Sequence, residues 1–544
     1  MSLSQLKQKF KGQISTNEAL LEKYSTDASV FKIAPKVIAI PKDTKDVEEL
    51  VKFVAQQKQT SPELSITVRG GGTDMTGGSI NESIIVDTVN LNKVESLNQQ
   101  SLTAQPGLFF RDIETKLIAQ NTILPCYPSS KSWCTLGGMA SNNAGGEKTL
   151  RYGQSINFVE ELEVILADGN TYTIKPLTQT ELTAKLAQTD FEGQLYQQVF
   201  RLVKDNYKLL QQAKPTTSKN ASGYYLWDVW DGTTFDLTKL FVGSQGTLGI
   251  ITKIKWRLVP LKRNRQLTVF YLETLKNLGE IVAELRKLDP ESVEVFDNQT
   301  FKIALRYLPE IGLRTKQSTW SLIWKFKKEI LQWLIGRLPQ IILLTEFTGT
   351  TPEEVEQQAQ KAQQIIKEQF NISSLLPNNT TEANRFWSIR RESYNLLRHH
   401  TARKLSAAFI EDIVVHPDQL PKFIPQIKAI IDRYPAFTYT IAGHAGDANF
   451  HIIPLVDLSN PKHRKELISL SDEVFNLVKK YQGSMTAEHN DGLVRGPFLE
   501  QMFGSQVLSL FKQVKTIFDP QNIFNPHKKS DASIEYYRDH VRSH

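Results

Sequence analysis

The chain is poor in cysteine, with only Cys126 and Cys134 among 544 residues. This scarcity excludes a disulfide-stabilised scaffold and favours a reducing compartment. It also excludes an iron–sulfur cluster held by this chain alone, since such a cluster normally needs four thiolates. Any cluster that works with this protein would therefore belong to a separate partner.

Long apolar runs are also absent. The opening MSLSQLKQKFKG lacks the apolar core of a signal peptide, and no uncharged stretch reaches the roughly 20 residues of a transmembrane helix. The sequence therefore predicts a cytoplasmic protein. One basic, tryptophan-rich stretch, 318–338, has apolar residues at helical spacing. This pattern suits a helix at a membrane interface or a helix packed on the protein's own core. In the first case the protein would be peripheral on the cytoplasmic membrane face.

The remaining composition is that of a large globular protein. With 40% hydrophobic residues, the chain can bury a sizeable core and is long enough for at least two domains. The net charge of +7 suits anionic substrates or an acidic membrane surface. No nucleic-acid-binding motif is present, so we expect no nucleic-acid partner.

Local patterns predict several secondary-structure elements. The β-branched stretch SITV (65–68) indicates a strand, and Thr44 is expected to cap an amphipathic helix within 36–54. The stretch 162–175 indicates a hairpin that turns at Asp168-Gly169. Further strands are expected at 340–347 and 407–415, and further helices at 353–369 and 501–518.

A glycine-rich run, VRGGGTDMTGG (68–78), follows the first of these strands. Three consecutive glycines remove Cβ atoms from a tight loop, so backbone N–H groups can approach a ligand and form an anion nest. The spacing fits neither a Rossmann fingerprint nor a P-loop. Taken alone, the run could also be an ordinary turn.

Two more glycine-rich segments follow, PSSKSWCTLGGMASNNAGGEKTLRYG (128–153) and GSQGTLGIIT (243–252). The first adds small residues and amides between its glycine pairs, and the second precedes an apolar strand. Three such segments in one region are hard to explain as turns alone. They indicate a binding site for a flat, polar ligand.

Together with the opening KVIAIPKDTKDVEELVKFV (36–54), the three segments resemble the FAD-binding domain of the vanillyl-alcohol-oxidase (PCMH-type) flavoprotein superfamily. The resemblance implies an α+β fold, with a two-part PCMH-type FAD-binding domain joined to an α+β substrate domain of the FAD-linked oxidase C-terminal type. The residues that it assigns to FAD are Arg69, Gly70, Gly71, Gly72, Thr73, Asp74, Pro128, Ser129, Leu136, Gly137, Gly138, Ser141, Asn142, Asn143, Gly145, Gly146, Tyr152, Gly153, Gly243, Gly246, Gly249, Ile250, Ile251 and Asn525.

The resemblance also bears on how FAD would be attached. Relatives with covalent flavin often have a histidine in the first glycine loop, where this chain has Thr73 and Asp74. Cys134 could in principle form a thioether, but a small buried thiol is the simpler interpretation. We therefore expect non-covalent FAD.

Three motifs extend the resemblance to the FAD-linked dehydrogenases of D-2-hydroxy acids. They are GHAGDANFH (443–451), AEHNDGLVRGPF (487–498) and FDPQNIFNPHK (518–528). The implied organisation is an FAD-binding domain at 20–260 and a substrate domain with a metal site at 262–490. A last segment, 491–530, would return to the flavin domain and bring Asn525 to the cofactor.

The motifs of the second half contain the expected chemistry. His444, His451 and Glu488 match the family's site for Zn²⁺, Fe²⁺ or Mn²⁺, and two imidazoles with a carboxylate suit a divalent metal that keeps positions open for substrate. Taken without the resemblance, the histidine pair would more simply be structural.

Two further side chains complete the set that the resemblance implies. His489 matches the general base that takes the hydroxyl proton as hydride leaves for flavin N5, with an orienting role as the alternative. Arg390 matches an arginine that binds the substrate carboxylate, whereas Arg391 should point elsewhere on the helix.

The chain departs from the family pattern at a few positions. Gln245 and His527 replace a glutamate and a glycine and are expected to lie behind the flavin contacts. Asn490 replaces a glycine beside His489 and could alter the substrate range. A lysine that some relatives use for a second carboxylate is absent near Ile410, which argues against 2-hydroxyglutarate.

The predicted function is oxidation of a D-2-hydroxy acid, with D-lactate as the leading substrate. The electrons would pass to a quinone, a cytochrome or a separate iron–sulfur partner. Two alternatives remain open: a redox-neutral enzyme of the alkylglycerone-phosphate synthase type, and a flavin subunit that acts only inside a larger redox complex.

Overall fold

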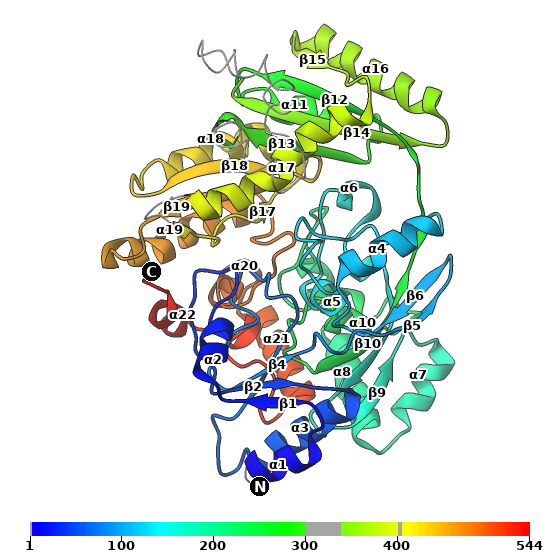
Figure 1. Cartoon of the computed structure of the whole chain (residues 1–544), viewed down its shortest axis with the longest axis vertical. Coiled ribbons are helices and arrows are strands. Elements are labelled where there is room, and N and C mark those ends of the chain that lie inside the picture. The colour runs from blue at the N-terminus through cyan, green and yellow to red at the C-terminus, as the bar shows by residue number, and fades with distance from the viewer. Residues whose placement is uncertain (1–2, 301, 303–338, 401–404, 544) are drawn as a thin grey trace.

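The computed structural model describes residues 3–300, 302, 339–400 and 405–543, and the stretch 318–338 lies outside them. Within the described part of the chain, no helix is both long and apolar enough to cross a membrane. Figure 1 shows two lobes: the lower is built around two sheets and contains the N-terminus, and the upper is built around a third sheet. The mixture of sheets and helices agrees with the predicted α+β class.

The first sheet has the strand order β1-β2-β4-β3, with bounds Gln13–Ser15, Val37–Ile40, Ile84–Asp87 and Ile66–Arg69. The β2–β4 and β4–β3 pairs are parallel, and helix α3 (Thr44–Gln57) forms the connection from β2 to β3. β3 confirms the strand predicted before the first glycine run. The helix cap was predicted wrongly: Asp43, not Thr44, accepts the N–H of Asp46, and Thr44 is the first helical residue.

The second sheet has the order β5-β6-β10-β8-β9 and is antiparallel throughout. Its strands are Val94–Leu97, Ser101–Ala104, Ile250–Arg257, Val159–Ile165 and Thr171–Ile174. The predicted hairpin is confirmed, with Gly169 in the left-handed region at φ 75°. One apolar core joins this sheet to the helices α4 (Phe110–Ala119), α5 (Leu136–Asn142), α8 (Phe191–Asp205) and α21 (Ser505–Phe518).

The third sheet, in the upper lobe, has the order β15-β12-β14-β13-β18-β19-β16, with every neighbouring pair antiparallel. Its strands are Ser373–Leu375, Asn264–Leu272, Ile341–Gly349, Ser292–Asp297, Thr438–His444, Asn449–Val456 and Leu405–Ser406. A further short strand, β17 (Ile413–Val414), pairs with β19. The strand predicted at 340–347 is confirmed. Of the one predicted at 407–415, only 413–414 is extended.

Alternation along these strands gives the third sheet two differently covered faces. Val293 and Val295 pack with the helices α11 (Leu278–Arg286), α16 (Pro352–Phe370), α18 (Leu420–Ile431) and α19 (Pro461–Lys480). Phe296 packs on the opposite face with Trp387 of α17 (Thr380–His400). α17 is therefore fixed against the face that also carries Glu294.

The C-terminal segment packs back on the lower lobe. The helix predicted at 501–518 is two helices, α20 (Leu499–Phe503) and α21, because Gly504 between them has φ 84°. Phe511 and Phe518 of α21 lie in the core of the second sheet. The N–H of Asn525 donates to the Ile66 carbonyl at 2.8 Å, which places this residue beside β3.

Candidate active site

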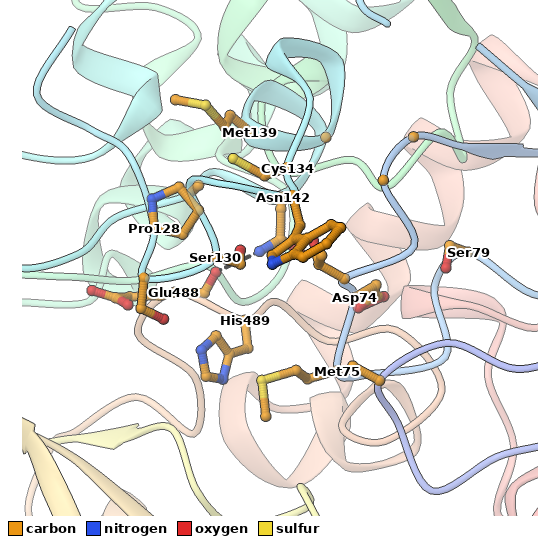
Figure 2. Close-up of a pocket in the computed structure, with 18 of the residues that line it drawn as sticks. Asp74, Met75, Ser79, Pro128, Ser130, Cys134, Met139, Asn142, Glu488 and His489 are labelled. Atoms are coloured by element: carbon orange, nitrogen blue, oxygen red, sulfur yellow. Dashed lines mark hydrogen bonds between the residues drawn. The ribbon is translucent and has the colours of Figure 1, made fainter. Parts of the chain in front are cut away.

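A cavity of about 600 Å³ lies where the lobes meet, within the usual size of a ligand pocket. All three glycine segments contribute to its wall, and so do α17, β18, β19 and the turn at 488–489. Figure 2 shows Glu488 and His489 across the cavity from Cys134 and Met139. The lining residues that the sequence predicted are Gly70, Gly71, Gly72, Thr73, Asp74, Pro128, Ser129, Gly137, Gly138, Ser141, Asn142, Gly145, Gly246, Gly249, Ile251, Arg390, His444, His451, Glu488 and His489.

The glycines of the lining serve two different purposes. A Cβ on Gly71 would lie 2.0 Å from the Trp133 carbonyl oxygen, so glycine is needed here for two loops to pack together. A Cβ on Gly246 would have no neighbour closer than 3.8 Å, and one on Gly138 none closer than 3.4 Å. Because both glycines line the cavity, a side chain at either would enter it. The cavity wall is therefore bare backbone at these points, which suits a large ligand.

Asp74 closes the first glycine loop on itself. Its carboxylate accepts the backbone N–H groups of Thr76 at 2.9 Å and Gly78 at 2.8 Å. Burial and the nearby Asp27 both disfavour a second negative charge, and they raise the pKa of Asp74 to about 6.

Some residues that the sequence assigned to the cofactor lie behind this wall. Asn525 donates to the carbonyls of Gly78 at 2.8 Å and Gln245 at 2.7 Å, and so ties two glycine segments together. Asn143 accepts the N–H of Ile156 at 2.9 Å. The others set back from the cavity are Arg69, Leu136, Gly146, Tyr152, Gly153, Gly243 and Ile250. Their placement indicates that these residues support the cavity wall from behind.

Three potential metal ligands converge in the upper lobe. His444 ends β18, His451 lies on the neighbouring β19, and Glu488 reaches them from the turn that follows α19. One ligand atom from each lies within 4.8 Å of the other two. Among the described residues, the buried Nδ1 of His451 has no hydrogen-bond partner. This nitrogen lies 3.9 Å from Oδ1 of Asp412, and two imidazoles with a carboxylate form a set that fits a divalent cation.

The ionisation of His451 and Glu488 suits a metal, whereas that of His444 does not. Burial opposes the charged form of His444, but Glu294 and Glu488 outweigh it and raise the pKa of His444 to about 9, so a metal would have to displace a proton from that ring. Burial, together with the charges on His444 and His489, holds the pKa of His451 well below its usual value. Burial opposes the charged form of Glu488, but His444 and Lys219 outweigh it and hold the carboxyl pKa well below its usual range. A neutral imidazole and an ionised carboxylate are the forms that bind metal.

His489 has a buried carboxylate behind it. Its Nδ1 lies 2.9 Å from Oε1 of Glu411, and the same oxygen accepts from the guanidinium of Arg495 at 2.9 Å. Burial opposes the imidazolium, but Asp412 and Glu411 outweigh it and raise the pKa of His489 to about 9. In the neutral ring, donation from Nδ1 leaves Nε2 as the nitrogen that can accept a proton.

Asp412 fixes the turn that carries Glu488 and His489. Its Oδ2 accepts the backbone N–H of Glu488 at 2.8 Å and that of His489 at 2.7 Å, together with the Thr486 hydroxyl at 2.6 Å. Asp412, His451 and His489 form a second group whose ligand atoms lie within 4.8 Å of one another. The bonds that Asp412 already accepts make it a brace for the turn.

Two adjacent arginines of α17 line the cavity. The guanidinium of Arg390 lies 3.1 Å from Oε2 of Glu294. Arg391 was expected to point elsewhere, and this was wrong: it lines the same cavity. Both oxygens of Glu147 hold its guanidinium, at 2.7 and 3.1 Å, in a bidentate pair across the lobes.

Four charged residues of the site were missed from the sequence. Glu411 and Asp412 interrupt an apolar run, and Glu294 lies inside the apolar strand β13. An acid inside an apolar stretch is a signal that could have indicated these three, because an unpaired buried charge is costly. Lys219, whose ammonium lies 2.5 Å from Oε1 of Glu488, gave no such signal.

The three residues that depart from the family pattern, Asn490, Gln245 and His527, have different contacts in the structure. Asn490 has φ 71°, in the region that glycine favours, and its amide donates to the Gly243 carbonyl at 2.9 Å. Its side chain therefore braces the second and third glycine segments, through the carbonyls of Asn142 and Gly243. Gln245 lines the cavity and accepts the N–H of Gly492 at 2.7 Å, whereas His527 stacks on Tyr536 with ring centres 4.2 Å apart.

Comparison with family models gives two matches. Residues 35–175 match the FAD binding domain, and residues 261–529 match the C-terminal domain of FAD linked oxidases. Together the matches include the first two glycine segments and all of the metal-ligand candidates.

Similar curated proteins carry related names. A D-2-hydroxyglutarate dehydrogenase of Pantoea ananatis is 26% identical over 96% of this chain, which spans about half of that relative's length (50%). The glycolate oxidase subunit GlcD of Bacillus subtilis is 25% identical over 93% of this chain and 91% of its own length. A D-lactate dehydrogenase of Archaeoglobus fulgidus is 26% identical over 93% of this chain and 95% of its own.

Solved structures share the fold at lower identity. The 4-ethylphenol oxidase of Gulosibacter chungangensis is 14% identical with a TM-score of 0.69, covering 98% of this chain and 97% of its own. An alkyldihydroxyacetonephosphate synthase is 16% identical with a TM-score of 0.65, covering 97% of this chain and 84% of its own.

Proposed function

The chain belongs to the FAD-linked oxidases, which are FAD-dependent oxidoreductases, and from this premise we propose that it oxidises a D-2-hydroxy acid to the 2-oxo acid. One observation carries the proposal. The glycine segments, a metal-ligand trio, a carboxylate-backed histidine and an arginine all face a single cavity. We propose D-lactate as the leading substrate.

The glycine-lined part of the cavity would hold FAD. Gly138 and Gly246 leave bare backbone there, and Asp74 and Asn525 keep the loops in shape. When bound, FAD supplies the acceptor for the Cα hydrogen and its electron pair. The electrons would then pass to a quinone, a cytochrome or a separate iron–sulfur partner. The two cysteines of this chain are buried free thiols, too few for the four thiolates that an iron–sulfur cluster normally needs.

Arg390 would bind the substrate carboxylate. Its guanidinium lines the cavity, and this planar group matches the geometry of a carboxylate. Among the described residues that line the cavity, Arg391 and Lys131 are further cations, and they pair with Glu147 and Glu114. A second substrate carboxylate would have to compete with Glu147 or Glu114 for these two cations. This favours a monocarboxylate such as D-lactate.

His489 would accept the hydroxyl proton through Nε2. Glu411 fixes the tautomer by accepting from Nδ1, and the Asp412 contacts to the backbone fix the position of the ring. His444, His451 and Glu488 would hold Zn²⁺, Fe²⁺ or Mn²⁺, which, when bound, lowers the pKa of a coordinated hydroxyl. The positive charge of that ion would also favour the neutral, proton-accepting form of His489.

The test of the substrate is an anaerobic panel in which bound flavin is mixed with single hydroxy acids. We expect D-lactate to bleach the flavin fastest, glycolate and D-2-hydroxyglutarate to bleach it slowly, and L-lactate to leave it oxidised. The shared fold with alkyldihydroxyacetonephosphate synthase keeps a redox-neutral activity as the second candidate. Persistent oxidised flavin across the panel would favour that candidate, or a subunit that works only in a complex.

FAD is expected to leave the protein intact when the chain is denatured. Burial raises the pKa of Cys134 to about 12, so the thiol beside the cavity is not ionised, and a thioether needs a thiolate. The measurement is flavin absorbance in the supernatant after acid precipitation. Flavin that stays with the precipitated chain would contradict this expectation.

Replacing Arg390 by lysine is expected to raise the KM for D-lactate by about 10- to 100-fold, the value of one charge-assisted hydrogen bond. The change in kcat should be smaller, because the positive charge survives. Arg391→Lys should act more weakly, since Glu147 already engages that guanidinium. Arg385→Lys, on the same helix and away from the lining, is the control. Equal effects at positions 390 and 391 would contradict the assignment.

A further inference from the structure

One buried carboxylate lies between the arginine and the metal-ligand trio. Glu294 is on β13, with its side chain only 2% exposed. Its Oε1 lies 2.6 Å from Nδ1 of His444, and its Oε2 lies 3.1 Å from Nη2 of Arg390. Each oxygen therefore has a different partner, and the two partners belong to different parts of the proposed site.

The contact to His444 fixes how this imidazole faces the other ligands. A carboxylate at Nδ1 holds the proton there and leaves Nε2 as the lone-pair nitrogen. That Nε2 lies 3.3 Å from Oε1 of Glu488, on the side of the trio. Without Glu294, the ring could rotate or exchange tautomers, and its lone pair would be lost to a metal for part of the time.

The contact to Arg390 fixes the other end. Arg390 has little freedom, because Trp387 and Phe386, in the preceding turn of α17, pack against the sheet. The side chains of Arg390 and His444 are only 10% and 6% exposed, so water screens neither contact strongly. The geometry of Glu294 therefore depends on both partners at once.

We propose that Glu294 is a positioning residue that couples carboxylate binding at Arg390 to metal binding at His444. The inference rests on the proposed function, because it takes the roles of Arg390 and His444 from there. A disturbance at Arg390 should move Glu294 and weaken metal binding, and loss of Glu294 should disturb both partners. A carboxylate that only filled space would transmit nothing between them.

The experiment is a double-mutant cycle on the flavin-loaded protein, with Zn²⁺ as the probe and a chromophoric chelator as the competitor. We expect Glu294→Gln to weaken Zn²⁺ binding by about 10- to 100-fold, as is usual for a group that orients a metal ligand. Arg390→Lys should also weaken it, by a smaller factor. The double variant should bind Zn²⁺ no more weakly than Glu294→Gln alone, because that substitution already removes the contact through which Arg390 acts on His444.

The control is Glu346→Gln, which removes another buried carboxylate from the neighbouring strand β14, away from the cavity lining. It should leave Zn²⁺ affinity unchanged. The proposal is overturned if Arg390→Lys has no effect on Zn²⁺ affinity, or if the two effects simply multiply in the double variant.

Two further measurements separate this coupling from the proposed function. If His444→Ala leaves Zn²⁺ affinity unchanged, the trio is not the metal site, and both proposals fail. If the cycle is non-additive but no hydroxy acid reduces the wild-type flavin, the coupling stands and the proposed substrate class is wrong.

Discussion

Replacing His489 by asparagine is expected to slow the reduction of bound flavin by D-lactate by about 10²–10⁴-fold, the usual effect of removing a general base. Asparagine keeps a polar side chain of similar size but cannot take the hydroxyl proton. FAD and metal content should be unchanged, because Glu488 and the glycine segments remain. The measurement is anaerobic stopped-flow absorbance, since steady-state turnover could be limited by the external acceptor.

A control for this substitution is His416→Asn. His416 lies on the surface of the upper lobe, where it pairs with Asp418, and its loss should leave the rate unchanged. Glu411→Gln should lower the rate without removing the imidazole, because the carboxylate that fixes its tautomer is lost. If the asparagine variant reduces its flavin at the wild-type rate with metal bound, the base lies elsewhere and His489 only orients its neighbours.

Removal of the divalent metal is expected to abolish oxidation of D-lactate while the flavin stays bound. The ion would lower the barrier by several kcal/mol through the coordinated hydroxyl, and FAD would be held by different residues. Chelator treatment followed by metal analysis and the same stopped-flow assay measures this. Adding back Zn²⁺, Mn²⁺ or Fe²⁺ should restore the rate and identify the metal.

The matched variants are His444→Ala and Glu488→Gln, which should stay inactive when metal is added back. His416→Ala should behave like the wild type. Full activity in a preparation shown by analysis to be free of metal would mean that His444, His451 and Glu488 serve only the structure.

Residues close in sequence could be assigned well before the structure was known. The first glycine run, the hairpin at Asp168-Gly169 and the strand at 340–347 each depend on local patterns, and the structure confirms these elements. The trio of His444, His451 and Glu488 came from motif resemblance, and the fold brings these side chains together.

Long-range partners could not be found in this way. Glu294 and His444 are 150 residues apart, and their pairing depends on β13 and β18 being neighbours in the third sheet. The prediction of a strand at 407–415 was largely wrong because it too ignored long-range contacts. Its two acids are buried in contacts to His489, Arg495 and the turn at 486–489, and only 413–414 remains extended.

Side-chain direction was the other source of error. Helical spacing suggested that Arg391 faces away from Arg390, yet both line a cavity that is wide enough to include adjacent positions of α17. Asn490 was expected to lie beside His489 and to alter the substrate range; its backbone has a positive φ, and its amide donates to the Gly243 carbonyl. Helical spacing gives the direction of a Cα–Cβ bond. The position of a long side chain's charged end depends also on the groups that bind it.

A single-turnover titration with D-lactate tests the central claim most directly. Flavin-loaded protein is mixed anaerobically with D-lactate, and loss of oxidised-flavin absorbance is compared with the pyruvate found after quenching. The account predicts one pyruvate for each flavin bleached, with bleaching slowed when the Cα hydrogen is deuterium. Flavin that stays oxidised while metal is bound, or bleaching without a matching amount of pyruvate, would contradict it.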